Sequence, residues 1–481
     1  MQIKIYFSVG KMQKIGYNKV GKMQEVIHVL KRKVYSTLKN WFDSNSKKGL
    51  LLTGARQIGK TYIIREFLKQ NSKNYVEFNL FENDLAKEAF ESSKTADDFL
   101  LKLSSLTKKT LIKNKTIIFI DEVQFAKEIV TKIKFLIEEG SYKYIFSGSL
   151  LGVELKHINS IPVGYMDIVE MYPMDFEEFA IANNVSERIL SYIKECYLNK
   201  KEVEPIIHEQ MLRLFNLYVV IGGFPEAVVQ YINTNNIQKV NDVHETIDKG
   251  YRMDISKYDQ EHSLLIKDIY DLIPSELNHT NKRFILKNLN EKARFYQYEE
   301  SFVWLIDSNV GLFTYNIDNP VYPLLASKER TLFKLFLCDV GLLTYKLFGD
   351  SAIKLLNNNK DVNYGALYEA VIAQELKAKN IPLYYYNNKK NGEVDFIIEN
   401  NDSIIPIEVK SGKDYKRHIA LDNLLSNDGY NIKEGYTLSN GNLQVNGKRI
   451  YLPIYMIMFF GFKEKNKDNI YKIDISSLTN K

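Results

Sequence analysis

The chain of 481 residues is too long for one ordinary hydrophobic core, so we expect two or three domains. Its composition, 45% hydrophobic and 26% charged, is typical of a globular protein, and its two cysteines exclude a disulfide framework. Residues 1–50 hold eleven Lys and Arg and two acids, so the net charge of +6 leaves −3 for the other 431 residues. Charge alone therefore does not identify a nucleic-acid binder.

The N-terminal residues 1–22 form a basic extension in which we expect little structure. A helical pattern follows Met23 (QEVIHVLKRKVYSTLKNWFDS), which makes Met23 an alternative start of the protein. No export signal is evident. The most apolar run, YLPIYMIMFFGF at 451–462, is too short to span a bilayer, so we expect a buried strand there and a cytoplasmic protein without a membrane span.

Four apolar runs alternate with helical patterns between residues 49 and 180. The runs lie at 49–54, 74–80, 115–122 and 142–149. Uninterrupted apolar strands separated by amphipathic helices indicate a parallel sheet covered on both faces. We therefore expect an α/β fold with a P-loop NTPase core over residues 23–184.

The segment GARQIGKT follows the first apolar run and precedes a helical pattern, which is the context that a phosphate-binding P-loop requires. Its glycines let backbone N–H groups turn toward phosphate oxygens, Lys60 would reach the β- and γ-phosphates of ATP, and Thr61 would ligate Mg²⁺. A chance glycine-rich turn is the alternative. The predicted nucleotide-binding residues are Gly54, Ala55, Arg56, Gln57, Ile58, Gly59, Lys60 and Thr61, together with Ser147.

The run IIFIDE ends in two acids at the carboxyl end of a buried strand, where ligands bind in open α/β sheets. We expect Asp121 to hold Mg²⁺ and Glu122 to orient the attacking water. The alternative is a cap for the next helix. The next strand ends in Ser147 and Ser149, either of which could sense the γ-phosphate or simply form a turn. Three arginines, Arg56, Arg65 and Arg252, are candidates for an arginine finger, and spacing does not choose among them.

The middle of the chain is mostly helical. Residues 185–260 are predicted to form a helical lid, interrupted by IGGFPEA. Residues 261–330 combine helices with a short strand, which favours a winged-helix-like segment. There Lys282 and Arg283 are candidates for contacts with a DNA backbone, and Trp304 is expected in the core. Phe176 and Phe179 are expected to pack a helix against the preceding domain.

Residues 331–481 are predicted to form a second α/β unit, in which a helix (GALYEAVIAQELKAKN) precedes the strands YYYN, EVDFII and SIIPIEVK. A four-residue hairpin loop at 400–403 would pair Glu399 with Ile404. Counting outward from that pair places Asp395 opposite Glu408. Side chains on directly opposite residues lie close enough to share a cation.

Lys410 lies on the same strand face as Glu408, and Glu369 of the preceding helix completes the group. Together these residues have the order of a PD-(D/E)xK nuclease site, with Asp395 and Glu408 as ligands of Mg²⁺ or Mn²⁺ and Lys410 positioning water or neutralising charge. Two alternatives remain: cross-strand ion pairs on a solvated face, or a nuclease-derived domain that only binds a partner. Nearby candidates for phosphate contacts are Lys389, Lys390, Lys413, Lys416 and Arg417, although a charge run is more often a solvated face. His418 has no ligand spacing, so a surface or packing role is favoured over catalysis.

The chain resembles the prokaryotic AAA-type ATPases that carry a C-terminal domain of uncharacterised function with a restriction-endonuclease-like fold. The resemblance covers the chain after about Met23. It rests on LLTGARQIGKTYIIREF, IIFIDEVQ, IFSGSLLGV, MYPMDFEEF, IGGFPEAV, FKLFLCDVGLL, GALYEAVIAQEL and GEVDFII followed by IPIEVKSG. It implies ATP binding, ATP hydrolysis, a cytoplasmic location and a winged-helix-like segment. AAA-type sites are often completed at subunit interfaces, which leaves room for a homo-oligomer.

Our leading hypothesis is therefore an Mg-ATP-dependent ATPase coupled to a nuclease-like domain that acts on DNA. A nucleotide-dependent switch that binds protein partners through an inactive nuclease fold is the first alternative. A toxin–antitoxin or mobile-element regulator is the second.

Overall fold

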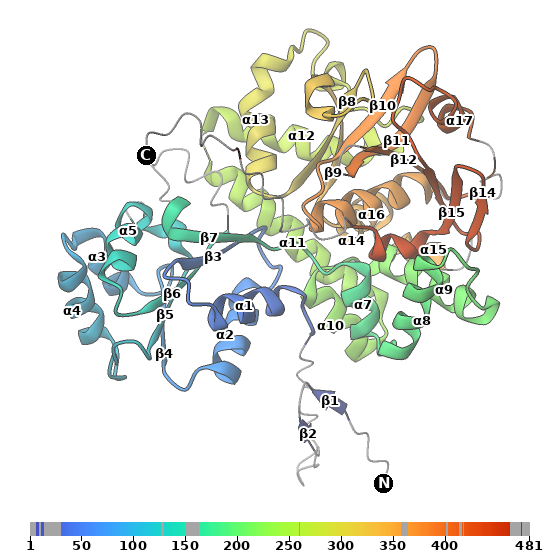
Figure 1. Cartoon of the computed structure of the whole chain (residues 1–481). Coiled ribbons are helices and arrows are strands. Elements are labelled where there is room, and N and C mark those ends of the chain that lie inside the picture. Colours follow the sequence, from blue (N-terminus) through green and yellow to red (C-terminus); the bar gives the residue numbers. More distant parts are fainter. Residues whose placement is uncertain are drawn as a thin grey trace.

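The structure is a computed structural model of the chain. It describes residues 6–8, 11–13, 30–126, 129–149, 163–258, 260–356, 364–400, 403–412, 416, 418–461 and 473. A five-stranded sheet and an eight-stranded sheet lie on either side of a group of helices (Figure 1). Most of the predicted N-terminal extension lies outside the described residues, as does the start of the helix predicted after Met23. Residues 30–33 of the predicted helix are described and are not helical, so the helix begins at Val34, as α1 (Val34–Asp43).

The five-stranded sheet is parallel, and its helices cover both faces, as predicted. The strand order is β4 (Tyr75–Asn79), β5 (Ile117–Asp121), β6 (Lys143–Ser147), β3 (Gly49–Thr53) and β7 (Met166–Glu170). The helices between the strands are α2 (Lys60–Asn71), α3 (Asp84–Ser92), α4 (Ala96–Leu106) and α5 (Ile129–Glu139). The edge strand β7 was not predicted, because its half-exposed sequence MDIVE lacks the continuous apolar run of the other strands.

Helices then form the centre of the molecule, as expected for residues 185–260. They are α7 (Phe176–Ala182), α8 (Glu187–Leu198), α9 (Pro205–Ile221), α10 (Pro225–Thr234), α11 (Ile237–Lys257), α12 (Gln260–Asn278) and α13 (Phe295–Asp307). Phe176 and Phe179 are fully buried, as expected, but the ring that both contact is Tyr218 of α9 in the central helices and not a ring of the preceding domain. Trp304 is buried as well. Among the described residues no single helix could cross a bilayer, although α9 and α10, bent by 119°, pass the length and composition test as a pair.

The second sheet has eight strands of mixed direction. Their order is β14 (Gln444–Asn446), β15 (Arg449–Pro453), β13 (Gly435–Ser439), β12 (Ser403–Lys410), β11 (Gly392–Asn400), β10 (Tyr384–Asn388), β8 (Gly311–Ile317) and β9 (Lys328–Leu337). Four helices accompany this sheet: α14 (Val340–Phe348), α15 (Ile353–Leu356), α16 (Tyr364–Ala378) and α17 (Ile419–Leu425).

Two features of this sheet differ from the sequence-based expectations. The boundary expected at 330/331 falls inside β9, and β8 pairs with both β9 and β10, so the strand assigned to a winged-helix-like segment belongs to the C-terminal sheet. The apolar run at 451–462 is a strand only to Pro453 and continues as a buried 3₁₀ helix, Ile454–Phe459. In both places the local apolar pattern is compatible with a strand. Where the strand ends, and to which sheet it belongs, depends on its pairing with strands far away in the chain.

One buried apolar cluster extends through all of these parts. It includes Leu50 of β3, Phe67 of α2, Phe215 of α9, Val371 of α16 and Leu438 of β13. Because this cluster is continuous, the two sheets share one hydrophobic core through the central helices and do not have separate cores.

Candidate functional site

The loop between β3 and α2 has the backbone geometry that its glycines predict. Gly54 and Gly59 have φ values of 133° and 89°, and Gln57 has 63°. A Cβ atom at Gly54 would lie 2.1 Å from the carbonyl oxygen of Met171, so a larger residue is excluded there. The left-handed turns bring the loop into the cradle shape that directs backbone N–H groups toward an anion at the start of α2.

A buried arginine holds this loop from behind. Arg32 donates to the carbonyl oxygens of Ile58 at 2.9 Å and Tyr172 at 2.6 Å, and its Nε donates to Glu178 at 3.0 Å. The sequence-based prediction missed this residue, because it lies in a basic segment that looks like a solvated face. Its contacts fix the loop to the segment after β7.

Lys60 is folded back onto the loop. Its Nζ donates to the carbonyl oxygens of Gly54 at 3.0 Å and Ala55 at 2.7 Å, and the residue is only 7% exposed. Burial lowers the pKa of Lys60 to about 8, against the opposing influence of Glu122 and Asp121. The ammonium group is therefore poised to exchange two neutral carbonyl partners for a more strongly negative one.

Asp121 collects three polar partners from three different elements. Thr61 Oγ1 donates to its two carboxylate oxygens at 3.1 and 3.0 Å, Asn79 Nδ2 donates at 3.3 Å, and Ser147 Oγ donates as well. Burial raises the pKa of Asp121. Hydroxyl and carboxylate oxygens are the ligands that Mg²⁺ prefers, so Thr61 and Asp121 fit a magnesium ion beside the loop. Asn79 was missed, although a polar residue ending a neighbouring strand was the signal for it.

Glu122 lies next to this group in a left-handed conformation, with φ of 57°. Its carboxylate accepts hydrogen bonds from Gln124 and, at 3.4 Å, from Ser149. The two serines that the sequence left open are thus divided between the acids, Ser147 at Asp121 and Ser149 at Glu122. Asp121 and Glu122 thus both lie at the carboxyl end of β5, the same end of the sheet as the P-loop.

The three candidate arginine fingers are all held in ion pairs. Arg56 pairs with Asp254 of α11 at 2.8 Å, and Arg65 pairs with Glu77 at 2.6 Å. Arg252 pairs with Asp248 of its own helix α11 at 2.6 Å and with Asp271 of α12 at 2.5 Å. The pair of Arg56 and Asp254 joins the loop directly to the central helices.

Comparison with protein families decides the class of this domain. Residues 46–180 match the model of an AAA domain. Residues 46–180 form an AAA-type domain. Two further family models match parts of the chain without describing an activity: residues 212–352 match a domain of unknown function (DUF8612) and residues 364–457 match another (DUF4143).

Solved structures similar to the chain have low sequence identity and low TM-scores. A Walker-type ATPase of Pyrococcus abyssi, PABY2304, has a TM-score of 0.40 and 14% identity, over 66% of this chain and 96% of that one. The Aeropyrum pernix ORC1 protein in complex with DNA has a TM-score of 0.29 and 12% identity, over 67% and 92%. PCH-2 of C. elegans has 0.25 and 14%, over 42% and 61%. No curated protein gives a match.

Outside the AAA-type domain, the predicted hairpin has the expected register. β11 and β12 pair through Glu399 with Ile404 and onward to Phe396 with Ile407, although residues 401–402 of the loop lie outside the described part. Asp395 follows directly, and its carboxylate accepts the backbone N–H of Val409 at 2.8 Å. The hairpin therefore brings Asp395 to the strand that carries Glu408.

The predicted residues are brought together, but with two further lysines. Lys410 pairs with Glu408 at 2.6 Å, and Glu369 of α16 faces the same cluster. Lys334 of β9 lies among the carboxylates, with Nζ 3.1 Å from Glu369, 2.7 Å from Glu393 and 3.6 Å from Asp395, and Lys282 also pairs with Glu369. We call these seven residues the carboxylate cluster: Lys282, Lys334, Glu369, Glu393, Asp395, Glu408 and Lys410.

The lysines divide the acids into two kinds. Burial and the neighbouring carboxylates raise the pKa of Asp395, and burial also raises that of Glu408. Burial opposes ionisation of Glu369 too, yet Lys334 and Lys282 outweigh it and lower the pKa of this residue. Glu369, Asp395 and Glu393 raise the pKa of Lys334 despite its burial. Glu369 and Lys334 thus stabilise each other's charged forms.

This arrangement does not fit a metal ion. The ammonium group of Lys334 takes the place between Glu369, Glu393 and Asp395 that a divalent cation would need. Across the described ranges, no three His, Cys, Asp or Glu side chains are grouped so that they could hold a metal. The roles predicted for Asp395 and Glu408 as ligands, with Glu369 completing the shell, therefore lack support. Lys334 was missed because it lies in the apolar run FKLFL, where nothing but its charge marks it.

The residues predicted to contact DNA differ in their exposure and in their partners. Lys282 is committed to Glu369, which corrects its assignment as a phosphate contact. Arg283 donates to Asn281 at 3.2 Å. Lys389 and Lys390 are in the turn between β10 and β11, and both are exposed. Lys413 and Arg417 lie outside the described residues. His418 is buried and bonds Tyr451 at 2.8 Å, in keeping with a packing role.

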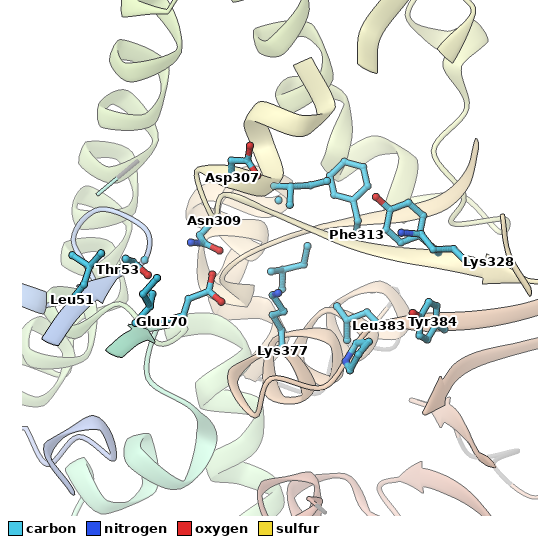
Figure 2. Close-up of a pocket in the computed structure, with 17 residues that line it drawn as sticks. Leu51, Thr53, Glu170, Asp307, Asn309, Phe313, Lys328, Lys377, Leu383 and Tyr384 are labelled. Carbon is cyan, nitrogen blue, oxygen red and sulfur yellow. The ribbon is translucent and has the colours of Figure 1, made fainter. Parts of the chain in front are cut away.

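A cavity of about 590 Å³ lies between the AAA-type domain and the C-terminal sheet. Figure 2 shows Thr53 and Glu170 on one side, Phe313 and Tyr384 on the other, and Lys377 between them. Thr53 and Gly54 line it, so the hollow reaches the start of the P-loop. It separates the edge strand β7 from the body formed by α13, β8 and α16.

Proposed function

We propose that the protein is an Mg²⁺-dependent ATPase that works as a conformational switch, in which the nucleotide state of the AAA-type domain controls the central helices and the C-terminal sheet. The single observation that carries this proposal is the ion pair between Arg56 of the P-loop and Asp254 of α11. It is the point at which a nucleotide and the rest of the molecule would compete for one side chain.

The residues of the loop divide the chemistry of ATP hydrolysis. Backbone N–H groups of residues 54–61 would bind the phosphate oxygens, and Lys60 would leave its carbonyl partners for the β- and γ-phosphates. Thr61 and Asp121 would hold Mg²⁺, which neutralises the charge that develops on the transferred phosphoryl group. Glu122, fixed by Gln124 and Ser149, would orient the attacking water.

The switch follows from the burial of Asp254. Its side chain is 1% exposed, one of its carboxylate oxygens has no hydrogen-bond partner among the described residues, and burial raises its pKa. A buried carboxylate is costly without its counter-ion. If a triphosphate draws Arg56 toward itself, Asp254 loses its partner and α11 is driven to move. ATP binding and the position of α11 are thereby coupled.

The test compares Asp254→Asn with Lys60→Ala and wild type. We expect wild type to hydrolyse ATP and to change its hydrogen exchange in α11 when ATP is added. Lys60→Ala should lose both effects, because the phosphates lose their ammonium partner. Asp254→Asn should still bind and hydrolyse ATP, and the ATP-dependent change in α11 should shrink severalfold, because no buried charge is created when Arg56 moves.

The matched control is Asp248→Asn, an acid on the same helix that pairs with Arg252 and not with the P-loop. It should leave the ATP-dependent change in α11 intact. A wild-type protein that does not bind ATP would overturn the proposed activity. An Asp254→Asn variant with an undiminished response in α11 would overturn the coupling.

Cleavage of DNA, predicted from the sequence, is the second candidate function, and it would require a metal ion to displace Lys334 from the carboxylate cluster. The observation in its favour is the convergence of Asp395, Glu408 and Lys410 next to Glu369, with Lys389 and Lys390 nearby in sequence. Incubation of wild type, Lys60→Ala and Asp395→Ala with plasmid and branched DNA, with Mg²⁺ or Mn²⁺ and with or without ATP, tests it. Cutting that Asp395→Ala abolishes would support a nuclease, and cutting also lost in Lys60→Ala would show coupling to ATP. ATP turnover without cutting or DNA binding favours the switch.

A further inference from the structure

We propose that Lys334 is the built-in cation of the carboxylate cluster, so that the wild-type cluster binds no divalent metal and acts as a charged joint between α16, β9 and β11. The proposal goes beyond the ATPase switch and is independent of it. It concerns the chemistry of the C-terminal sheet alone.

The first support is the charge of the cluster. Its four carboxylates face three ammonium groups, and each of the lysines has an acid within ion-pair distance. A divalent cation would convert this nearly balanced set into one with excess positive charge. Like charges repel strongly in a buried site, because little water is present to screen them.

The second support is the position of Lys334. Its side chain is 0% exposed, and its ammonium group lies 5.2 Å from the ring centre of Tyr385 on one side and among Glu369, Glu393 and Asp395 on the other. A lysine at a surface can swing into water and make room for a metal. Lys334 has no such exit, so a metal could enter only by leaving an unpaired ammonium group inside the protein.

The third support is the set of elements that Lys334 joins. Glu369 belongs to α16, Glu393 and Asp395 to β11, and Lys334 itself to β9. β9 is at the edge of the sheet, separated from β11 by β8 and β10. The ion pairs therefore span four strands and the helix packed on them. These contacts tie the strands and the helix together, and they leave Glu369 and Asp395 without free oxygens for a metal ion.

The experiment measures Mn²⁺ binding by electron paramagnetic resonance in nucleotide-free protein that carries Asp121→Asn, which removes the metal ligand of the AAA-type domain. In this background we expect no Mn²⁺ bound at the cluster. Adding Lys334→Met should create a site for about one Mn²⁺, with binding at least tenfold tighter than any residual binding by the background protein, because the acids lose their cation. Adding Asp395→Asn as well should abolish that site.

The matched control is Arg330→Met, which removes a positive charge from the exposed part of the same strand and should create no site. Two results would overturn the proposal: Mn²⁺ bound by the background protein and lost on Asp395→Asn, or a folded Lys334→Met protein that gains no site. If Lys334→Met does not fold, Lys334→Gln replaces it. The measurement on the Asp121→Asn background protein shows by itself whether the cluster binds Mn²⁺. ATP turnover, assayed separately in protein with Asp121 intact, reports on the switch and not on this inference.

Discussion

Lys60 shows how burial prepares a single residue for ligand exchange. Its two hydrogen bonds to carbonyl oxygens of the P-loop satisfy the ammonium group without a counter-ion, and burial accordingly lowers its pKa to about 8. The same feature that makes it ready for phosphate also brings its titration close to physiological pH. Binding of ATP should therefore depend on pH in a range where exposed lysines stay fully charged.

We expect the affinity for ATP to fall roughly tenfold between pH 8 and pH 9.5, because the protonated amine binds phosphate and the neutral amine does not. Titration with a fluorescent ATP analogue at pH 7, 8, 9 and 9.5 measures this dependence. The control is Lys60→Met, which should bind more weakly throughout and show no loss over this range. A wild-type affinity that stays flat from pH 7 to pH 9.5 would contradict the lowered pKa.

At the residue scale, sequence predicted the groups that follow a local rule. The P-loop, Asp121, Glu122 and the pairing of the hairpin all depend on spacing along one or two strands, and each residue lies where that spacing requires. Arg32 and Lys334 were missed, because their roles depend on partners far away in the chain. Arg32 contacts Glu178, and Lys334 contacts Glu369, and no local pattern marks either pair.

At the scale of elements, the turn between α9 and α10 packs directly against the start of α14. The turn between α9 and α10 carries Gly222 and Gly223, and the start of α14 carries Asp339 and Gly341. Asp339 accepts the N–H of Gly223 at 2.6 Å and that of Leu342 at 3.0 Å, and burial raises its pKa to about 6. The two backbones approach so closely that glycine is required on both sides. The joint fixes the central helices to β9 and α14.

Gly341→Ala should destabilise the protein by about 1–3 kcal/mol or more, as expected for overpacking of a buried contact. The added Cβ would lie 2.4 Å from the carbonyl oxygen of Ile221, a backbone atom that cannot rotate away. Thermal unfolding measures the loss. The control, Gly412→Ala, has nothing within 4 Å of the added Cβ and should change stability little. Equal unfolding temperatures for the two variants would exclude a tight joint.

The sequence also predicted the positions of helices and strands better than it predicted which strands pair. Helices and apolar strands were found where the hydrophobic period was clear, and the parallel sheet followed from them. The assignment of residues 261–330 to a separate winged-helix-like segment did not hold for β8. That strand has the same local pattern in either arrangement, and only its pairing with β10, about 70 residues later, assigns it to the C-terminal sheet.

At the scale of the whole molecule, the AAA-type domain is attached to α16 on one side, and a cavity separates it from the C-terminal sheet on the other. On the anchored side, Glu375 of α16 accepts the backbone N–H of Phe176 at 2.6 Å, and Asp175 pairs with Lys33. Burial raises the pKa of Glu375 to about 7. On the other side lies the cavity between β7 and the C-terminal sheet. A rotation of the AAA-type domain about this attachment would close the cavity.

Filling the cavity should therefore slow ATP turnover without unfolding the protein. Ile168 of β7 lines the cavity and is 49% exposed, so a larger side chain is accommodated there without displacing core atoms. We expect Ile168→Trp to keep its unfolding temperature and its affinity for ATP while kcat falls several-fold, because closing of the cavity is blocked. Ile168→Val, which fills no space, should have the turnover of wild type. An Ile168→Trp enzyme with unchanged kcat would mean that the cavity keeps its volume throughout the ATPase cycle.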